Sequence, residues 1–434
     1  MITRTITRRR FVALWLGLLA QARAWAQSPA QLRWVWLGAC TNEGVTIKAR
    51  TAPGVELRLS ATREGDTGAS PVERTAVADQ QGVATFVLSG LRERTRYRYT
   101  VAGPGAPLDG TFRTFADGPF SFRAVFASCC STGSISPVFD YMRYQRPDLF
   151  VHMGDLHYRN IRRNVPALFA AAYDRVLMSR TQSQLFRNTP VAYIWDDHDY
   201  GPDDADGTSP SRPAALASYR SFVPHYPMDA RSEATIHQAF SVGRVRFLIT
   251  DTRSARSPRT VPAAERTMLG RDQLAWLLGE LQKASDAPLV IWINTVPWIT
   301  KRNEATIEGW APYAGERRII ADAIKRHGLT RRLLMLSGDA HMLAIDDGTN
   351  SEYATGAASG DRGFVVAHAG PMDRYPRIKG GRYSHGQIAQ NGQFGVLDVV
   401  DDGRSVQVTI QGHRGAAPVS GMRLQFTCEE DESR

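Results

Sequence analysis

The chain has 434 residues, of which 43% are hydrophobic and 22% are charged, as in ordinary globular proteins. This length is too great for one compact core, so we expect two domains. Neither a low-complexity tract nor a fixed-period repeat stands out. The formal net charge is +10. Five unpaired arginines lie within the first 26 residues: Arg4, Arg8, Arg9, Arg10 and Arg23.

Without these five charges the rest of the chain keeps a balance of about +5, which is too small to indicate a polyanion as partner. The remaining arginines are scattered and are not interleaved with aromatic residues as in a single-strand binder. We therefore expect no specific nucleic-acid partner. Arginine remains a good ligand for phosphate, because its planar fork binds two oxygens at once.

The first 26 residues are typical of an export signal. Residues 7–11 (Thr-Arg-Arg-Arg-Phe) form a twin-arginine pattern, residues 11–20 are apolar but too short to cross a bilayer, and residues 24–26 (Ala-Trp-Ala) offer a cleavage site. We predict a twin-arginine (Tat) signal at 1–26, export by the Tat machinery in folded form, a periplasmic or secreted location and no stable transmembrane anchor. The alternatives are a Sec signal with a basic start, or an uncleaved anchor.

The four cysteines are Cys40, Cys129, Cys130 and Cys428. In an oxidising compartment a disulfide between Cys40 and Cys428 is one pairing, but sequence does not determine connectivity. Cys129 and Cys130 are adjacent, which disfavours a bridge between them. At least one thiol therefore needs another explanation.

Residues 30–115 have the pattern of an all-β domain. Alternating apolar residues at 45–49, 55–59 and 84–88 predict half-buried strands separated by turns. Residues 91–99 and 110–114 resemble the late strands of a fibronectin type III-like sandwich. This unit has no clustered ligand set, so we assign it to packing or to shaping the substrate site.

From residue 119 to residue 428 the pattern changes to a larger α/β domain. Apolar strands end repeatedly in polar residues, and helical patterns at 165–178, 270–284 and 315–327 lie between them. The polar strand ends are Ser128–Cys130, Gly154–Tyr158, Trp195–Asp199, Thr250–Arg253, Asn294–Thr295 and Ser337–His341. Ligands of open α/β sheets gather at the carboxyl ends of strands, so these residues predict one active site.

The side chains at these ends fall into two chemical sets. A thiolate, a phenolate and an imidazole suit a transition metal, whereas carboxylate and amide oxygens suit calcium, magnesium or manganese. Asp155 is the natural bridge between the two sets, because it shares a turn with Tyr158 and has two oxygens.

The order of four motifs resembles the alkaline phosphatase D (PhoD-like) metallophosphatases, relatives of the purple acid phosphatases within the calcineurin-like superfamily. The motifs are Ala127–Cys129, Gly154–Tyr158, Trp195–Asp199 and Gly338–His341. The resemblance covers most of the chain after the leader. It implies a metallophosphoesterase β-sandwich flanked by helices, preceded by the small fibronectin type III-like domain.

The resemblance also implies the metals and their ligands. Ferric iron would be held by Cys129, Asp155 and Tyr158, with help from Asp339 and His341. Asp197 stands where the superfamily has an asparagine and would bind the second ion, most simply calcium, with magnesium or manganese as alternatives. Asn294 is a further candidate ligand of that ion. For Cys129 the plain alternative is a small buried hydrophobe, and for His341 a core histidine.

The implied mechanism is attack on phosphorus by a metal-bound hydroxide between the two ions. His198 matches the superfamily's catalytic histidine, with Asp196 or Asp199 to orient it, although it is alternatively a metal ligand. Asp155 is the second catalytic residue, as the bridging carboxylate. Arg253 is a candidate phosphate clamp or a structural ion-pair partner of Asp251.

His157 is left without an assignment. Its spacing from Asp155 imitates the first ligand pair of other calcineurin-like enzymes, yet Tyr158 already takes the iron-ligand position. We do not expect both to bind.

The preferred function is an exported phosphomonoesterase acting on a phosphate ester. One alternative is a phosphodiesterase or a phospholipase D-like hydrolase with the same metals, because loops set the substrate class. Another is a non-catalytic cell-surface binding protein in which the second domain is a degenerate enzyme.

Overall fold

The computed structural model describes residues 30–66, 68, 70–229, 233–300 and 308–429. The predicted export signal at 1–26 lies outside these ranges. Within them, no helix is both long and apolar enough to span a bilayer.

The N-terminal unit consists of two facing β layers. Its strands are β1 (Trp34–Gly38), β2 (Val45–Arg50), β3 (Glu56–Arg63), β4 (Val72–Val77), β5 (Val83–Leu88), β6 (Arg96–Ala102) and β7 (Leu108–Arg113). One layer is the sheet β4-β3-β6-β7, and the other contains β1, β2 and β5. Alternate residues of β3 and β6, such as Leu57 and Tyr97, are buried between the layers. The expected small β-sandwich is present.

The second layer of this unit continues into the larger part of the molecule. The nine-stranded sheet has the order β20-β19-β18-β8-β9-β10-β1-β2-β5. Its other strands are β8 (Phe122–Ala127), β9 (Leu149–Met153), β10 (Val191–Ile194), β18 (Gln393–Asp401), β19 (Ser405–Arg414) and β20 (Ala417–Glu429). β1 joins β10 in parallel, with Gly38 opposite Val191. The sequence predicted two units, but here their sheet and their core are continuous.

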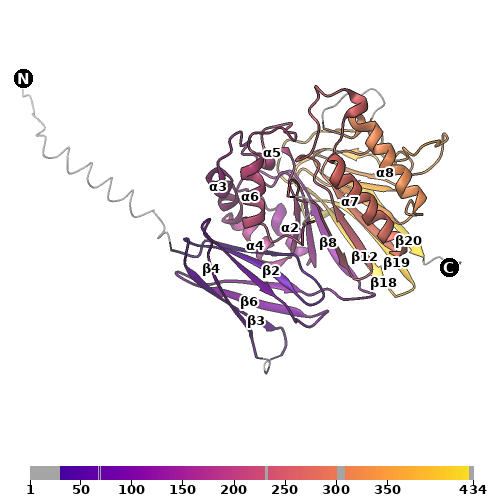
Figure 1. The fold of residues 1–434 in the computed structure, drawn as a ribbon. Helices are drawn as coiled ribbons and strands as arrows, with labels where there is room; N and C mark the ends of the chain where they lie inside the picture. Colours follow the sequence, from indigo (N-terminus) through magenta and orange to yellow (C-terminus); the bar gives the residue numbers. More distant parts are fainter. Residues whose placement is uncertain (1–29, 67, 69, 230–232, 301–307, 430–434) are drawn as a thin grey trace, which may run out of the picture.

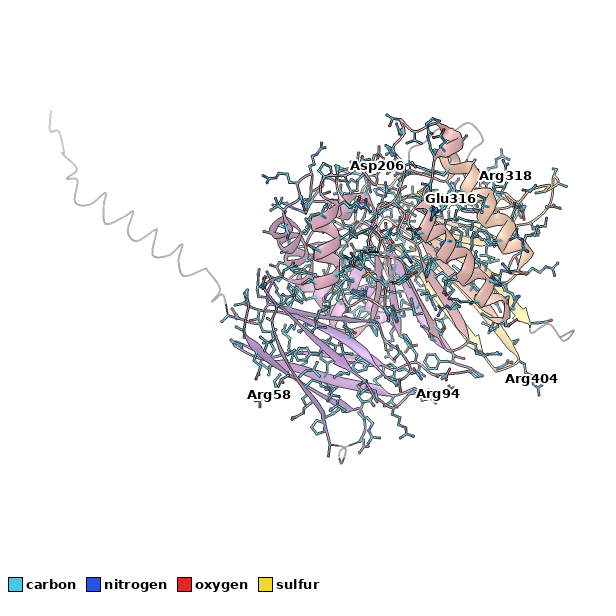
Figure 2. The ribbon with its side chains drawn as sticks, in the orientation of Figure 1. Arg58, Arg94, Asp206, Glu316, Arg318 and Arg404 are labelled. Atoms are coloured by element: carbon cyan, nitrogen blue, oxygen red, sulfur yellow. The ribbon has the colours of Figure 1, made fainter. Side chains whose placement is uncertain are left out.

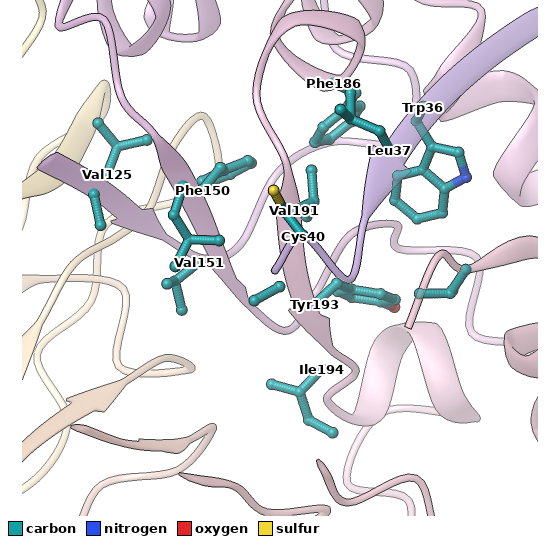
Figure 3. Packing of buried hydrophobic residues seen from close by; sticks show 14 of the residues in the cluster. Trp36, Leu37, Cys40, Val125, Phe150, Val151, Phe186, Val191, Tyr193 and Ile194 are labelled. Atoms are coloured by element: carbon teal, nitrogen blue, oxygen red, sulfur yellow. The ribbon is translucent and has the colours of Figure 1, made fainter. Parts of the chain in front are cut away.

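The contact between β1 and β10 is apolar. Figure 3 shows Trp36 and Leu37 beside Val191 and Tyr193, all within one buried cluster. Trp36 is fully buried and donates from Nε1 to the carbonyl of Phe222 at 2.8 Å. The two units are therefore packed as one body.

A second sheet of seven strands packs against the first. Its order is β11-β12-β13-β14-β16-β15-β17, with bounds β11 (Gln238–Val242), β12 (Val245–Ile249), β13 (Leu289–Asn294), β14 (Leu333–Ser337), β15 (Leu343–Asp346), β16 (Val365–His368) and β17 (Gln387–Ile388). In β13, Ile291 and Ile293 belong to the core shared with the first sheet, whereas Val290 and Trp292 belong to a separate cluster with α7 (Gly270–Lys283) and α8 (Ala314–Arg326). Successive side chains of a strand point to opposite faces of the sheet, so alternate residues of β13 belong to different clusters.

Helices cover the outer faces of the two sheets (Figure 1). The larger helices are α2 (Val138–Tyr144), α3 (Pro166–Leu177), α4 (Arg180–Asn188), α6 (Arg212–Phe222), α7 (Gly270–Lys283) and α8 (Ala314–Arg326). The short ones are α5 (Asp197–Tyr200), η1 (Ala263–Glu265), η2 (Ala284–Asp286) and η3 (Ala311–Tyr313). The structure thus has the architecture that the sequence predicted, a two-sheet sandwich between helical layers. In Figure 2, Arg58 and Arg404 lie on the outside of separate parts of the molecule, as scattered arginines should.

The disulfide considered between Cys40 and Cys428 is not formed. All four cysteines are free and buried. Cys40 follows β1, whereas Cys428 lies on β20 at the far edge of the same sheet, with β19, β18, β8, β9 and β10 between them. At roughly 4.8 Å per strand this separation exceeds about 20 Å, beyond the reach of a disulfide.

Asp174 of α3 ties the two units together. Its carboxylate accepts hydrogen bonds from Trp34 Nε1 at 2.7 Å, Arg33 Nη1 at 2.7 Å and Arg50 Nε at 3.2 Å, and its side chain is 11% exposed. The substitution Asp174→Asn should lower the free energy of unfolding by about 2–4 kcal/mol, because charged partners are left beside a neutral amide in a buried site. Urea denaturation measures this loss.

The matched control is Asp140→Asn, which removes a partly exposed pair with Arg143 on α2. Its cost should stay below about 1 kcal/mol. Equal effects of the two substitutions would contradict the bridging role of Asp174.

Candidate metal centre

The polar strand ends of both sheets meet at one edge. β8, β9 and β10 are parallel to one another, and so are β12, β13 and β14. The two sheets touch where these strands end, because a Cβ on Gly338 would lie 2.1 Å from the carbonyl oxygen of Met153. A Cβ on Gly154 would lie 2.5 Å from the Cβ of Asp196. Glycine at these two positions allows the close approach of the loops that carry the polar groups.

Four candidate ligands have left-handed backbone conformations. Their φ angles are 63° at Cys129, 58° at Asp155, 58° at Asp339 and 51° at His341. Such angles are uncommon outside glycine, cost on the order of 1 kcal/mol or more each, and cluster at functional sites. This strain directs all four side chains towards one region instead of along their strands.

The first cluster contains Cys129, Asp155, Tyr158 and His341. The Tyr158 hydroxyl lies 2.6 Å from Asp155 Oδ2 and 3.0 Å from His341 Nε2. Single ligand atoms of Cys129, Asp155 and His341 lie within 4.8 Å of one another. With ligand bonds of about 2.0–2.3 Å, atoms on one metal ion are separated by roughly 3 Å, so the predicted iron ligands have suitable spacing.

The second cluster is rich in oxygen. Asp155, Asp197 and His198 form one group of candidate ligand atoms within 4.8 Å, and Asp197, Asp204 and Glu308 form another. Asp155 and Asp197 each belong to two groups, so the clusters form a continuous series. The sequence identified Asp204 only as part of an acidic loop and gave no indication of Glu308.

Asp339, which we assigned to the iron site from the sequence, is linked to this second cluster through Lys379. Lys379 Nζ lies 2.6 Å from Asp339 Oδ1 and also contacts Glu308 Oε2. Burial opposes the charge on Lys379, but Asp339 and Glu308 together raise its pKa. The sequence gave no signal for this lysine, since it follows no strand that ends at the site.

Positive partners within the chain compensate the buried acids unequally. Burial, followed by repulsion from Asp197 and Asp196, raises the pKa of Asp155 well above its usual range. Burial and the charge of Glu308 raise the pKa of Asp339 to about 6. Burial would also raise that of Asp197, but Arg253 and His198 hold its pKa at about 2. These shifts are expected where a cation completes the site.

Three carboxylate oxygens have the properties that a bound cation requires. Asp155 Oδ1, Asp197 Oδ1 and Asp339 Oδ2 are buried and accept no hydrogen bond from the described part of the chain. Buried oxygens normally have a partner, and carboxylate oxygens are the preferred ligands of hard divalent ions. The donor set of thiol, phenol, imidazole and bridging carboxylate likewise suits a transition metal.

His198 lies beside both clusters, with its ring centroid 4.1 Å from that of Tyr158. Its Nδ1 is 2.5 Å from Asn160 Oδ1, and its Nε2 is 3.4 Å from Asp203 Oδ1. The expected orientation by Asp196 or Asp199 is therefore wrong in this structure, where Asn160 has that place.

Both of those aspartates are engaged elsewhere. Asp199 accepts the Leu156 amide at 2.8 Å and the Tyr193 hydroxyl at 2.6 Å. Asp196 accepts from Arg253 Nε at 2.5 Å and from Thr295 at 2.9 Å. They fix the turn that carries His198 and do not contact its ring.

Arg253 is not positioned as a phosphate clamp. Its side chain is 0% exposed and pairs with Asp196, while Nη2 lies 3.7 Å from Asp197 and 3.9 Å from Glu308. Asp251, the alternative ion-pair partner, instead accepts the Arg253 backbone amide at 3.0 Å. Arg253 thus provides a fixed positive charge behind the oxygen-rich cluster.

Asn294 is hydrogen-bonded to other residues, and His157 belongs to none of the groups of candidate ligand atoms among the described residues. The amide oxygen of Asn294 accepts from Trp310 Nε1 at 3.1 Å, and its nitrogen donates to the Val296 carbonyl, so the geometry does not favour it as a ligand. His157 is buried with its ring centroid 6.0 Å from that of Tyr173. Packing against an aromatic neighbour accounts for its presence.

A cavity of about 350 Å³ opens over the second cluster. Its polar walls include His198, Asp204, Glu308, Asp339 and Lys379. The remaining lining residues include His341, Arg377 and Ile378. This volume is enough for a small ester, and the metal-ligand candidates lie along its wall.

Comparison with known proteins identifies the family and the fold of the chain. The model of the PhoD-like phosphatase family matches residues 124–367. A structure of PhoD aligns over 93% of this chain and 92% of that chain, with a TM-score of 0.73 and 15% identity. Purple acid phosphatase PPD1 from yellow lupin (Lupinus luteus) seeds aligns over 93% and 75%, with a TM-score of 0.66 and 12% identity. No curated protein matches the sequence. At these identities the two structures establish the fold.

Divalent ions should bind the oxygen-rich cluster more weakly at pH 5 than at pH 7.5. Burial, together with Glu308, raises the pKa of both Asp339 and Asp204 to about 6, so below that pH an ion must displace their protons. The raised values also mean that the folded, metal-free chain binds protons that the unfolded chain releases, so its stability should fall as pH rises from about 4 to 6.

Calorimetric titration with Ca²⁺ at the two pH values measures the affinity, and we expect a difference of at least about 10-fold. The variant Asp402→Asn, which changes a solvent-exposed turn, should keep the same pH dependence. Equal affinity of the wild-type protein at both pH values would contradict the assignment of these carboxylates.

Proposed function

Because the chain belongs to the PhoD-like phosphatase family, we propose that this phosphoric ester hydrolase is an exported phosphomonoesterase with a ferric ion and a calcium-type ion. The observation that carries the proposal is the pair of adjoining clusters that share Asp155. One offers sulfur, phenol and imidazole, and the other offers carboxylates. Two adjacent ions can stabilise both the attacking and the leaving oxygen at phosphorus, and these two donor sets suit chemically different ions.

The ligand assignment follows the geometry. Cys129, Asp155, Tyr158 and His341 would hold ferric iron. Asp155 would also face the second ion, together with Asp197 and Asp339, while Asp204 and Glu308 are further oxygen donors at the same cluster. When bound, the two ions would acidify a water molecule and stabilise negative charge at phosphorus.

The remaining steps belong to the protein. The cavity would admit the phosphoryl group to the wall formed by Asp339, Glu308 and His341. His198 lines the cavity, and its Nδ1 donates to Asn160 Oδ1. When the ring also carries a proton on Nε2, that proton can pass to the leaving alkoxide, which leaves the neutral imidazole. The hydrogen bond to Asn160 fixes the ring in the orientation that this step needs.

The strongest alternative is a phosphodiesterase with the same ligands. Arg377 in the cavity wall supports a monoester, because its positive charge can offset the extra negative charge of a dianion once ions occupy the acidic cluster. The leader pattern at 1–26 supports the proposed export, and the Tat route would carry the folded, metal-loaded protein.

The iron assignment predicts a coloured protein. Tyrosinate and thiolate bound to ferric iron absorb visible light, so purified protein should contain about one iron per chain and show a visible band. Tyr158→Phe removes the phenol that lies 2.6 Å from Asp155 Oδ2 and should shift or abolish that band while the fold is retained. Elemental analysis and absorption spectroscopy measure both. A colourless, iron-free wild-type protein would contradict the assignment of Cys129 and Tyr158 as iron ligands.

The monoesterase assignment predicts faster turnover of para-nitrophenyl phosphate than of its bis-ester. In the variant His198→Ala, kcat for the monoester should fall by about 10²–10⁴, because the leaving group loses its proton donor. Steady-state kinetics on both substrates measures these values. A large preference of the wild-type enzyme for the diester would establish the alternative.

The control for His198 is His157→Phe. Phenylalanine preserves the packing against Tyr173, and His157 Nε2 has no hydrogen-bond partner in the described residues. Both kcat and metal content should stay within about 3-fold of wild type. A loss as large as that of His198→Ala would place His157 in the reaction after all.

A further inference from the structure

The second cluster already contains a cation supplied by the chain. Lys379 Nζ is 2.6 Å from Asp339 Oδ1 and contacts Glu308 Oε2, and its side chain is only 18% exposed. The two acids are similarly enclosed, at 4% and 17%. An ammonium group therefore sits between two carboxylates that also face the candidate ion site.

The lysine is held there by the chain on both sides. The carbonyl of His341 accepts the Arg377 amide at 3.1 Å, and His341 Nδ1 lies 2.6 Å from the Tyr375 carbonyl oxygen. After the lysine, Gly381 donates its amide to the carbonyl of Ile299 at 3.0 Å. Lys379 thus lies on a segment anchored to an iron-ligand candidate, not on a free surface loop.

Glu308 and Asp339 differ in how many of their oxygens have a cationic partner. Both oxygens of Glu308 face cations, because Oε2 contacts Lys379 and Oε1 lies 3.9 Å from Arg253 Nη2. In Asp339, Oδ1 is held by Lys379, whereas Oδ2 is buried without a hydrogen-bond partner in the described residues. An incoming ion can use Asp339 Oδ2 directly, but it must displace Lys379 to use Glu308 Oε2 or Asp339 Oδ1.

On the basis of the proposed two-metal function, we propose that Lys379 is a positioning residue that competes with the second ion for Asp339 and Glu308. Its ammonium group orients Asp339 and weakens the binding of a divalent ion, which keeps that ion exchangeable. The affinity of oxygen sites for calcium depends on the number of charged ligands, so removal of the competitor leaves two more carboxylate charges available. A buried carboxylate without its partner also gains more from binding a cation.

Among the residues that the structure describes, no lysine or arginine forms an ion pair with Asp155 in the first cluster. Arg374 stacks over the ring of Tyr158, with its Cζ 3.9 Å from the centroid, and does not pair with Asp155. The two ions should therefore differ in how fast they exchange with ions in solution. The ion beside Cys129 and Tyr158 would be held firmly, and the ion beside Lys379 would be released by mild chelation.

The test is a Ca²⁺ titration of the full-length, iron-loaded protein after weakly bound divalent ions have been removed on a chelating resin. The variants are Lys379→Met, which removes the ammonium group, and Lys379→Arg, which keeps a positive charge. The matched control is Arg377→Met, which removes one charge from the wall of the same cavity without releasing a carboxylate pair. Circular dichroism and iron content verify that each variant folds.

We expect Lys379→Met to bind Ca²⁺ at least about 10-fold more tightly than wild type, with Lys379→Arg near wild type and Arg377→Met within about 2-fold. Unchanged or weaker binding by Lys379→Met overturns the proposal, and so does an equal gain in Arg377→Met, which would indicate general charge alone. If neither wild type nor any variant binds Ca²⁺, the two-metal function itself fails. The readout is affinity, so the result does not depend on which ester is hydrolysed.

Discussion

The charge of the buried carboxylates is the constraint on which the rest of the structure depends. Asp155, Asp196, Asp197 and Asp339 are each at most 3% exposed and lie at one edge of two packed sheets. Burying even one unpaired carboxylate is costly, and burying several together is worse. The chain supplies two fixed cations, Arg253 and Lys379, and leaves the remaining charge to ions from outside. The fold and its metals are therefore parts of one electrostatic arrangement.

The backbone is built to keep these charges together. Parallel strands from two sheets end at the same edge, and Gly154 and Gly338 let their loops come closer than any side chain would allow. Left-handed conformations at the ligand positions then turn the side chains inwards. Most of the stability that offsets this strain comes from the apolar sandwich below the site, where whole strands such as β9 and β14 are buried.

Sequence reasoning was most successful where local patterns determine position. Apolar strands that end in polar residues identified the edge, and the order of motifs identified the family, because both depend on neighbours along the chain. Partners distant in sequence were not predicted. Arg253 pairs with Asp196 across 57 positions, and Lys379 reaches Asp339 across 40. No periodicity specifies which arginine or lysine will neutralise a given acid.

The same limit explains the remaining differences. Asn294 ends a strand at the predicted edge, but its amide is taken by Trp310, a residue that sequence does not place nearby. Glu308 and Asn160 come from loops whose course is set by tertiary packing, so neither followed from a strand pattern. The type of chemistry could thus be predicted from the sequence, whereas the partners that orient and balance it depend on the folded structure.

The join between β1 and β10 has a consequence for how the molecule assembles. β10 leads into Asp196 and Asp197. In the sheet it lies between β9 and β1, and β1 comes from near the beginning of the described chain. Until β1 is in place, β10 has an open edge, which is the kind of surface on which strands of other chains add. By pairing β1 with β10, the N-terminal sandwich therefore covers an edge of the larger unit's strands in the nine-stranded sheet. Such long-range pairing also makes completion of the metal-binding edge a late event in folding.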